Sequence, residues 1–174
     1  MSIYHSFLVT LKEYVRLGRK NAFPIIEQCP SCHAYARLYG HGYYERHACE
    51  NETAYLLVIR RLRCRACGIT ISILPDFLLP YYQNTLQMII GGLRVRMIQG
   101  KKSGSHRQIY YFYEKRYCKQ IKKVEMFFRD LGWRKKLPDS PIEKAMKLLE
   151  MITSFGEATF IRRFTDHFSQ HFMA

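Results

Sequence analysis

The sequence predicts an α+β fold in which short antiparallel strands that carry four cysteines are followed by an all-α region. Up to about residue 75, apolar runs rich in β-branched and aromatic residues are separated by short turns, which is typical of strands. After that point, apolar residues recur three and four positions apart, which is typical of amphipathic helices. With 174 residues, 48% of them hydrophobic, the chain has enough apolar material for a packed core.

On this basis we divide the chain into four parts. Residues 1–28 form an N-terminal helical segment, 29–75 the cysteine-rich strands, 76–136 a basic helical region and 137–174 a C-terminal pair of helices. The N-terminal segment lacks a basic start and is interrupted by charged residues, so we do not interpret it as a signal peptide. Every apolar run is far shorter than the roughly 20 residues of a membrane span. We expect a cytoplasmic protein with reduced thiols and no membrane partner.

Four of the six cysteines occur in two pairs of identical spacing, "CPSC" (Cys29 and Cys32) and "CRAC" (Cys64 and Cys67). Each pair can reach one metal ion from a tight turn, and two such turns place four thiolates in a tetrahedron around Zn²⁺. Gly68, directly after the second pair, can adopt the positive φ that lets backbone amides point at the sulfur atoms. We therefore predict a zinc ribbon that binds one zinc ion through all four cysteines.

The segments between and after the cysteine pairs are strand-like. The runs "AYARLYGHGYY", "AYLLVIRRLR" and "ITISIL" each predict a strand, and the polar run "ERHACENET" connects the first two. Strand alternation places Arg61, Arg63 and Arg65 on one face, with Arg60 on the other. These arginines either offset the negative charge of a four-thiolate zinc site or hold phosphate groups, and the two roles are compatible.

Other metal-binding or redox interpretations of this region are weaker. His33, in the first turn, and His41, His47 and Cys49, between the two pairs, are further potential ligands. The simpler interpretation is that they are ordinary polar residues of turns and loops. A redox-active CxxC pair is normally found in a βαβ setting, which this sequence lacks.

Positive charge is concentrated in one part of the chain. The formal net charge is +14, and the segment from Arg94 to Lys136 contains 14 basic and three acidic residues, a net charge of +11. A basic block that also contains aromatic residues favours a polyanionic partner, most often nucleic acid. The alternative is a solvated basic face that only aids solubility.

The basic region predicts a helix-turn-helix arrangement. A first helix begins near Asn84 and contains Gly91 and Gly92, which close approach of another helix would explain. After the basic turn "QGKKSGS", a second helix covers 106–117, with Ile109, Phe112 and Tyr113 on its inner face, and a third helix covers 118–131. In this arrangement the second helix enters the DNA major groove. The alternative is an ordinary helical hairpin with exposed charges.

The predicted DNA contacts follow from this geometry. Residues on the outer face of the second helix would reach base edges, while the basic turn, the third helix and the arginines beside the cysteines would hold phosphates. The predicted base-reading residues are Arg107, Tyr111 and Lys115. The predicted phosphate-contacting residues are Arg61, Arg63, Lys101, Lys102, Ser103, Lys119, Lys122 and Lys123.

The C-terminal part predicts two further helices. "SPIE" at residues 140–143 is a capping box with proline at the first helical position, and the helix that follows places Ile142, Ala145, Leu149 and Ile152 on one face. After Gly156, a last helix aligns phenylalanines. These apolar faces close the core, or alternatively form a homodimer or contact another protein.

The order of motifs "CPSC", "RRLRCRACGITISILPDFLLPY", basic helices and "LGW" resembles an uncharacterised bacterial family related to insertion-sequence transposases. The resemblance covers roughly residues 25–135 and is most specific over residues 60–81. It implies that Cys29, Cys32, Cys64 and Cys67 bind zinc. It also implies that the zinc ribbon and helix-turn-helix hold DNA, as in the N-terminal part of such transposases. It identifies no base-reading residue.

The function we expect is that of a zinc-dependent protein that binds double-stranded DNA, acting as a mobile-element accessory or a transcriptional regulator. The chain has no room for the catalytic domain of a transposase and no three-carboxylate arrangement for two metal ions, so we do not expect an enzyme. The alternative is a protein-interaction adaptor that uses the ribbon and the Phe-rich C-terminal helices. RNA binding through "YYFY" is disfavoured, because stacking aromatics are expected on an open sheet.

Overall fold

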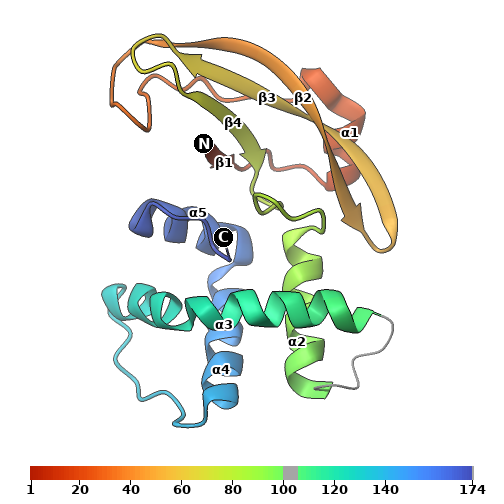
Figure 1. Cartoon of the computed structure of the whole chain (residues 1–174), viewed down its shortest axis with the longest axis vertical. Coiled ribbons are helices and arrows are strands. Elements are labelled where there is room, and N and C mark those ends of the chain that lie inside the picture. Colours follow the sequence, from red (N-terminus) through yellow and green to blue (C-terminus); the bar gives the residue numbers. More distant parts are fainter. Residues whose placement is uncertain (100–105, 174) are drawn as a thin grey trace. The chain divides into compact units, whose positions relative to one another are not determined.

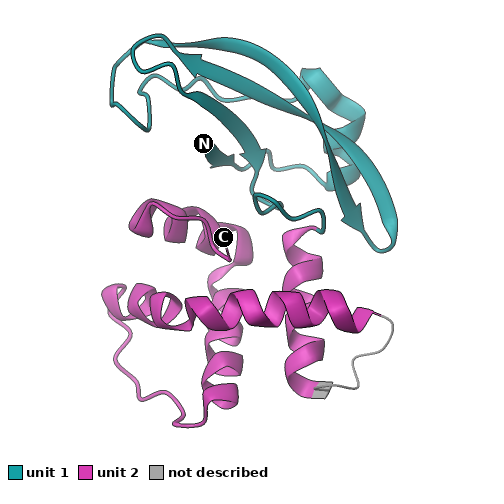
Figure 2. Cartoon of the chain, in the orientation of Figure 1, with its two compact units in different colours: residues 1–84 teal, residues 85–174 magenta. Residues whose placement is uncertain are grey.

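The computed structural model describes residues 1–99 and 106–173. It consists of two compact units, unit 1 (residues 1–84) and unit 2 (residues 85–174), coloured separately in Figure 2. The class is α+β, with a small four-stranded sheet in unit 1 and helices in both units. Of the four expected parts, the first two and the start of the third lie in unit 1, and the rest lies in unit 2. None of the helices in the described part of the chain has the length and apolar character needed to cross a membrane.

The sheet of unit 1 has the strand order β1-β4-β3-β2 (Figure 1). The strands are β1 (Ser2–His5), β2 (Leu38–Glu50), β3 (Thr53–Cys64) and β4 (Thr70–Pro75). Strand β1 pairs parallel to β4, whereas β4 with β3 and β3 with β2 are antiparallel. The segment 1–28 is therefore only partly helical: β1 joins the sheet, and helix α1 (Leu11–Leu17) and the short 3₁₀ helix η1 (Gly18–Lys20) follow it.

The β2–β3 hairpin is longer than the sequence predicted. The polar run 45–53 was expected to be a connection, but β2 continues through it to Glu50, which pairs directly with Thr53. The turn consists of only Asn51 and Glu52, both with positive φ (47° and 64°). Two consecutive residues with positive φ are typical of the two-residue hairpin turn that matches the twist of the flanking strands, and asparagine tolerates this conformation.

Both faces of this sheet are covered within unit 1. On one face, Leu57 and Ile59 pack with Leu11 and Tyr14 of α1, and the Tyr14 hydroxyl donates a hydrogen bond to the Val58 carbonyl (3.0 Å). On the other face, the buried residues are Cys29, Leu62, Cys64, Ile71 and Ile73, with Phe23 and Ile26 packed against them. Burial on both sides explains why the neighbours Ile73 and Leu74 of β4, which face opposite sides of the sheet, are both buried and apolar.

Unit 2 contains four helices in its described residues: α2 (Leu86–Gln99), α3 (Arg107–Asp130), α4 (Pro141–Phe155) and α5 (Glu157–Phe168). In Figure 1, α3 runs across both α2 and α4. The two helices expected over 106–117 and 118–131 are one continuous helix of 24 residues. No glycine or proline interrupts this segment, so nothing in its sequence ends the helix before Gly132, whose φ is +91°.

The buried face of α3 differs from the predicted one. Ile109 and Phe112 were expected to face inward, but they are 37% and 44% exposed, whereas Tyr113 is only 2% exposed. The face is set by the whole helix, because Tyr113, Tyr117, Val124 and Phe128 recur at helical spacing along its length. Phe112 does not belong to this buried row, and its side chain is partly exposed to solvent.

The other helix boundaries agree closely with the sequence. Helix α2 begins at Leu86, close to the expected start, and the Thr85 hydroxyl accepts a hydrogen bond from the Met88 amide (3.4 Å). Helix α4 follows Ser140 and begins at Pro141, as the capping box predicted, although the Ser140 side chain forms no capping hydrogen bond. Gly156, with a φ of +91°, separates α4 from α5.

The apolar faces of α4 and α5 close the core of unit 2. Phe160 and Phe164 of α5 are fully buried, and Phe160 packs against Phe127 and Phe128 of α3, with ring centroids 5.2 and 5.9 Å apart. Of the residues predicted to face inward on α4, all but Ile142 are buried. The prediction that the phenylalanines of α5 close the core is thus confirmed for Phe160 and Phe164.

Gly92 of α2 allows the close approach of α3 that the sequence suggested. A Cβ atom at Gly92 would lie 2.6 Å from two ring carbons of Tyr110, whereas one at Gly91 would meet nothing within 4 Å. We expect Gly91→Ala to raise the melting temperature, because glycine in a helix interior is about 1 kcal/mol less favourable than alanine. Gly92→Ala should lower it, because the Tyr110 ring must move.

Thermal melts of the two alanine variants test this contact. Combining Gly92→Ala with Tyr110→Ala should restore part of the lost stability, since the second change removes the clash. If Gly91→Ala and Gly92→Ala shift the melting temperature by the same amount and in the same direction, the close approach of Tyr110 is wrong.

Candidate functional site

The four paired cysteines converge at one end of the sheet of unit 1. Their sulfur atoms all lie within 4.8 Å of one another, and the Sγ–Sγ distances are 3.8 Å for Cys29–Cys67 and 3.7 Å for Cys32–Cys64. Cys64 ends β3, and Cys29 belongs to the segment that packs on the same face of the sheet. Residues from distant parts of the chain therefore form one group that can hold a metal ion.

The two cysteine turns have the same backbone geometry. In the first turn, the His33 amide donates to the Cys29 carbonyl and the Cys29 amide donates to the Ala34 carbonyl (2.9 and 3.0 Å). The second turn repeats both bonds, from Gly68 to Cys64 and from Cys64 to Ile69, at the same distances. The residue after each second cysteine has a positive φ, +57° at His33 and +73° at Gly68. The turn predicted for the glycine thus forms at the histidine as well.

The distances between the sulfur atoms fit a tetrahedral metal–thiolate centre. With metal–sulfur bonds of about 2.3 Å, the edges of a sulfur tetrahedron are about 3.8 Å long, close to the two Sγ–Sγ distances given above. They are far longer than the roughly 2.05 Å of a disulfide bond, and all four cysteines are free thiols. The donor set and its spacing therefore match a bound metal ion.

The thiols of this group titrate differently from one another. The backbone amide of Cys32, helped by that of Ser31, donates to the Cys29 sulfur and lowers the pKa of that thiol to about 7. For Cys32, the Ala34 amide acts to lower the pKa, but the adjacent thiols of Cys67, Cys29 and Cys64 outweigh it and raise the pKa to about 12. Coordination to a metal ion would deprotonate all four thiols.

The arginines around the second cysteine pair lie on both sides of β3. Arg60 stacks on Phe23 (5.8 Å from guanidinium carbon to ring centroid) and Arg61 on Tyr44 (5.7 Å), which confirms that these two point to opposite faces. Arg63 is exposed and donates through Nε to the Gly68 carbonyl (3.3 Å), so it also supports the second turn. Exposed Arg65 stacks on Tyr39 (5.2 Å).

The additional metal ligands considered from the sequence lie outside the four-cysteine group. His41, His47 and Cys49 are residues of strand β2, and His33 is an exposed turn residue. The Cys49 amide donates to the Gln83 carbonyl (2.7 Å), which ties the end of β2 to the last residues of unit 1. Among the residues that the structure describes, only the four paired cysteines form a metal-binding group.

The predicted DNA-contacting residues of α3 fall mostly on one face of the helix. Arg107, Tyr111, Lys115, Lys119 and Lys122 are exposed and recur at intervals of three or four residues, which places them on the side opposite the buried row. Lys123 differs, because it is half-buried and its amino group donates to the Gln170 side chain. The predicted contacts Lys101, Lys102 and Ser103 lie outside the described residues.

The acidic residues of α3 are each paired with a cation. Glu114 forms an ion pair with Arg96 (2.8 Å), and Asp130 with His167 (3.0 Å). The Lys144 amino group, together with Arg129, binds Glu125 and lowers the pKa of that carboxyl group. By contrast, Lys115, Lys119 and Lys122 form no ion pair within residues 1–99 and 106–173. We call the exposed face formed by Arg107, Tyr111, Lys115, Lys119 and Lys122 the α3 basic face.

Sequence reasoning assigned no role to Arg96, which the structure places beneath the α3 basic face. Arg96 of α2 is buried, forms the ion pair with Glu114 and lies under the Tyr111 ring (5.5 Å from guanidinium carbon to ring centroid). It therefore joins α2 to the first half of α3 and positions Tyr111. The signal in the sequence was weak, because Arg96 is one of two arginines in a largely apolar helix.

The fold and the cysteine group define an α+β protein with four clustered cysteines that could hold a metal ion and with a helical unit. A family model described as "Domain of unknown function (DUF6431)" matches residues 29–111. The match begins at the first of the four clustered cysteines and ends inside α3, so it includes both cysteine turns, α2 and the start of α3. No curated protein and no solved structure has significant similarity to the chain.

Proposed function

We propose that this chain is a zinc-dependent protein that binds double-stranded DNA without catalysing a reaction. The single observation that carries the proposal is the α3 basic face, on which cations without acidic partners in the described residues line one side of a continuous helix. The metal ion held by the four cysteines stabilises the fold of unit 1, and the helices of unit 2 make the main contacts with DNA.

Zinc is the metal that suits this centre best. Four thiolates in tetrahedral geometry favour zinc or iron–sulfur chemistry, and two paired CxxC turns are typical of structural zinc sites, which have no open coordination position. The antiparallel strands β2, β3 and β4 beside the four cysteines support a zinc ribbon. Cys29, Cys32, Cys64 and Cys67 would hold the ion, and Arg63 and Arg65 would offset the negative charge of the thiolates.

The charge arrangement of α3 favours a polyanion. Several lysines elsewhere in unit 2 have acidic partners, as in Lys136–Asp139 (3.1 Å) and Lys147–Glu150 (3.0 Å). Lys115, Lys119 and Lys122 have none in the described part of the chain, although they lie close together and repel one another. DNA phosphates would neutralise this charge and release counterions. The helix from Arg107 to Lys122 spans about 22 Å, enough to follow several phosphates.

The α2–α3 pair supports a helix-turn-helix-like mode of binding. Helix α3 crosses α2 (Figure 1), and Arg107, Tyr111 and Lys115 in its first half are exposed, as base-reading residues of a recognition helix would be. The connection between Gln99 and Arg107 is longer than the three or four residues of the usual turn, so the arrangement is a variant of that motif. We propose Arg107, Tyr111 and Lys115 as groups that reach base edges.

The resemblance to the N-terminal part of insertion-sequence transposases agrees with this proposal. That resemblance and the DUF6431 match overlap over the cysteine centre and the α2–α3 pair. The role we infer is a cytoplasmic mobile-element accessory or transcriptional regulator. The adaptor alternative relied on the Phe-rich C-terminal helices, and it loses support because Phe160, Phe164 and Phe172 are buried in unit 2.

Replacing Lys115, Lys119 and Lys122 together by glutamine tests the proposal. Binding to duplex DNA should weaken, and the slope of log K against log salt should become shallower by about 0.9 for each phosphate that the variant no longer neutralises. The matched control replaces the exposed Lys12, Lys20 and Lys147, all outside α3, by glutamine. It makes the same change in net charge, and we expect it to retain most of the binding. Fluorescence anisotropy over a series of salt concentrations measures both variants.

Two outcomes would contradict DNA binding through α3. An equal decrease of affinity in both triple variants would mean that net charge alone attracts DNA. Undetectable duplex binding by the wild-type protein at low salt would favour the adaptor function. Single-stranded DNA and RNA of the same sequence, titrated in parallel, should bind more weakly than the duplex.

A further inference from the structure

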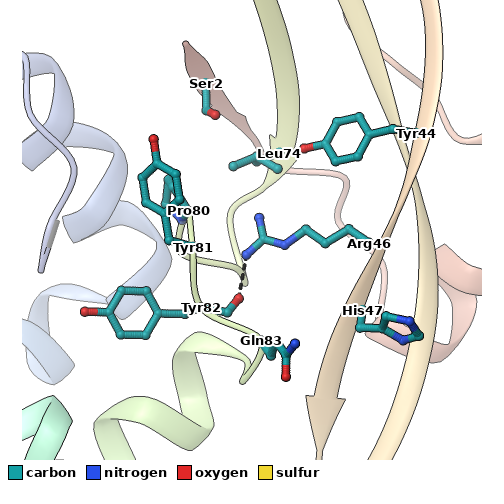
Figure 3. Close-up of a pocket in the computed structure, with 9 residues that line it drawn as sticks. All are labelled: Ser2, Tyr44, Arg46, His47, Leu74, Pro80, Tyr81, Tyr82 and Gln83. Atoms are coloured by element: carbon teal, nitrogen blue, oxygen red, sulfur yellow. Dashed lines mark hydrogen bonds between the residues drawn. The ribbon is translucent and has the colours of Figure 1, made fainter.

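Unit 1 contains a pocket of about 300 Å³ that lies away from the cysteine centre. Figure 3 shows its lining, in which the Arg46 side chain extends from β2 toward the segment 80–83. In this view, Ser2, Leu74 and the Tyr44 hydroxyl lie above the guanidinium group, Gln83 lies below it and the Tyr81 ring lies to its left. A volume of this size is at the lower end of the range, roughly 300–1,000 Å³, in which proteins bind small ligands.

Arg46 carries a positive charge that no acidic group in the described residues balances. Its Nη2 atom donates to the carbonyl oxygens of Leu79 and Tyr82, both at 2.5 Å, and this fixes the guanidinium group in place. Its Nε and Nη1 atoms have no acceptor in the described part of the chain, and Arg46 forms no ion pair there. The group is half-buried, and burial lowers its pKa. An anionic partner would stabilise this half-buried arginine, because the partial removal of an unpaired charge from water is costly.

The remaining lining suits an anion that carries an aromatic group. Ser2, Tyr44 and Gln83 supply neutral hydrogen-bond donors, and the described lining includes no carboxylate. The ring of Tyr81 is 91% exposed, so it packs against little of the protein, and its backbone has a φ of +70°. Residues with a bulky side chain rarely adopt this conformation, and they tend to do so at binding sites.

We propose that this pocket binds a nucleotide through its phosphate group. Three N–H groups of Arg46, one on Nε and two on Nη1, are available for the phosphate oxygens, which arginine binds with two parallel hydrogen bonds. The base stacks on the exposed Tyr81 ring, since aromatic side chains stack on bases regardless of sequence. The nucleotide comes either from solution or from the 5′ end of a DNA strand, and the two sources share this chemistry.

Titration calorimetry with 5′-deoxyadenosine monophosphate, inorganic phosphate and deoxyadenosine tests the site in the full-length protein. We expect the monophosphate to bind at least about tenfold more tightly than either fragment, because only it uses both Arg46 and Tyr81. Arg46→Gln should abolish binding of the monophosphate and of phosphate. Tyr81→Gly should reduce monophosphate affinity about to that of phosphate, while it relieves the positive φ and leaves the fold intact.

Leu8→Gly is the matched control for Tyr81→Gly, because Leu8 is 93% exposed, has a φ of +54° and lies outside the pocket lining. It should leave nucleotide binding unchanged. A 5′-phosphorylated oligonucleotide that binds more tightly than the free nucleotide, in an Arg46-dependent way, identifies the strand end as the source; equal affinity identifies the free nucleotide. Failure of the wild-type protein to bind the monophosphate, or unchanged binding by Tyr81→Gly and Arg46→Gln, would overturn the proposal. Neither result depends on duplex binding by α3.

Discussion

Replacing Cys64 by serine is expected to remove the bound metal and to unfold the cysteine-rich part of unit 1. A structural zinc ion contributes on the order of 10 kcal/mol or more to the folding of such sites. That is comparable to the whole stability of many domains, which is about 5–15 kcal/mol. Cys64 is buried at the end of β3, and its sulfur lies 3.7 Å from that of Cys32, so a serine there leaves an incomplete donor set inside the structure.

Elemental analysis and circular dichroism check this expectation. The wild-type protein should contain one zinc ion per chain, and Cys64→Ser should contain none and show a weaker strand signal. Cys49→Ser and Cys118→Ser are the controls, because neither sulfur belongs to the four-cysteine group, and both should retain the metal. Wild-type protein that is folded and free of metal would refute the zinc site.

Truncation of Phe160 to alanine is expected to have the second-largest effect, a decrease of about 3–5 kcal/mol in the free energy of unfolding. Its ring is fully buried and contacts Phe127, Phe128, Phe164 and Phe172. The control is the same change at Phe112, which is 44% exposed on α3 and lies beside Arg116 (5.4 Å) and the Tyr113 ring (6.1 Å). Phe112→Ala should change the free energy of unfolding by about 0.5 kcal/mol or less.

Chemical denaturation curves of the two variants make the comparison. Phe160→Ala should be far more destabilising than Phe112→Ala, whereas the sequence periodicity alone predicted that Phe112 is buried. If Phe112→Ala is the more destabilising of the two, then the orientation of α3 in the structure is wrong.

The parts of the fold that could be predicted from sequence are those set by local chemistry. The cysteine pairs were recognisable because metal coordination requires a fixed spacing, and the ends of α4 were recognisable because Pro141 and Gly156 have strong local preferences. Strand β1 was missed because its pairing with β4 joins residues about 70 positions apart, and nothing within "SIYH" shows it.

The errors in β2 and α3 have separate physical causes. The second half of β2 is polar because β2 is an edge strand of the sheet, and polar edge strands resemble loops in sequence. In α3, the adjacent aromatic residues Phe112 and Tyr113 make two orientations of the helix plausible when only this short segment is considered. The packing of Phe127 and Phe128, further along the helix, determines which side is buried. Arg46 could not be assigned from sequence, since its carbonyl partners are more than 30 residues away.

The continuous helix α3 has a consequence for how this protein can change over evolutionary time. The side chains on its buried side pack in the core of unit 2, so substitutions there lower the stability. Substitutions at most exposed positions change the free energy of unfolding by about 0.5 kcal/mol or less. The outward residues of α3 can therefore vary almost independently of stability. A chain built in this way can acquire a new binding preference by a few outward substitutions, without passing through an unstable intermediate.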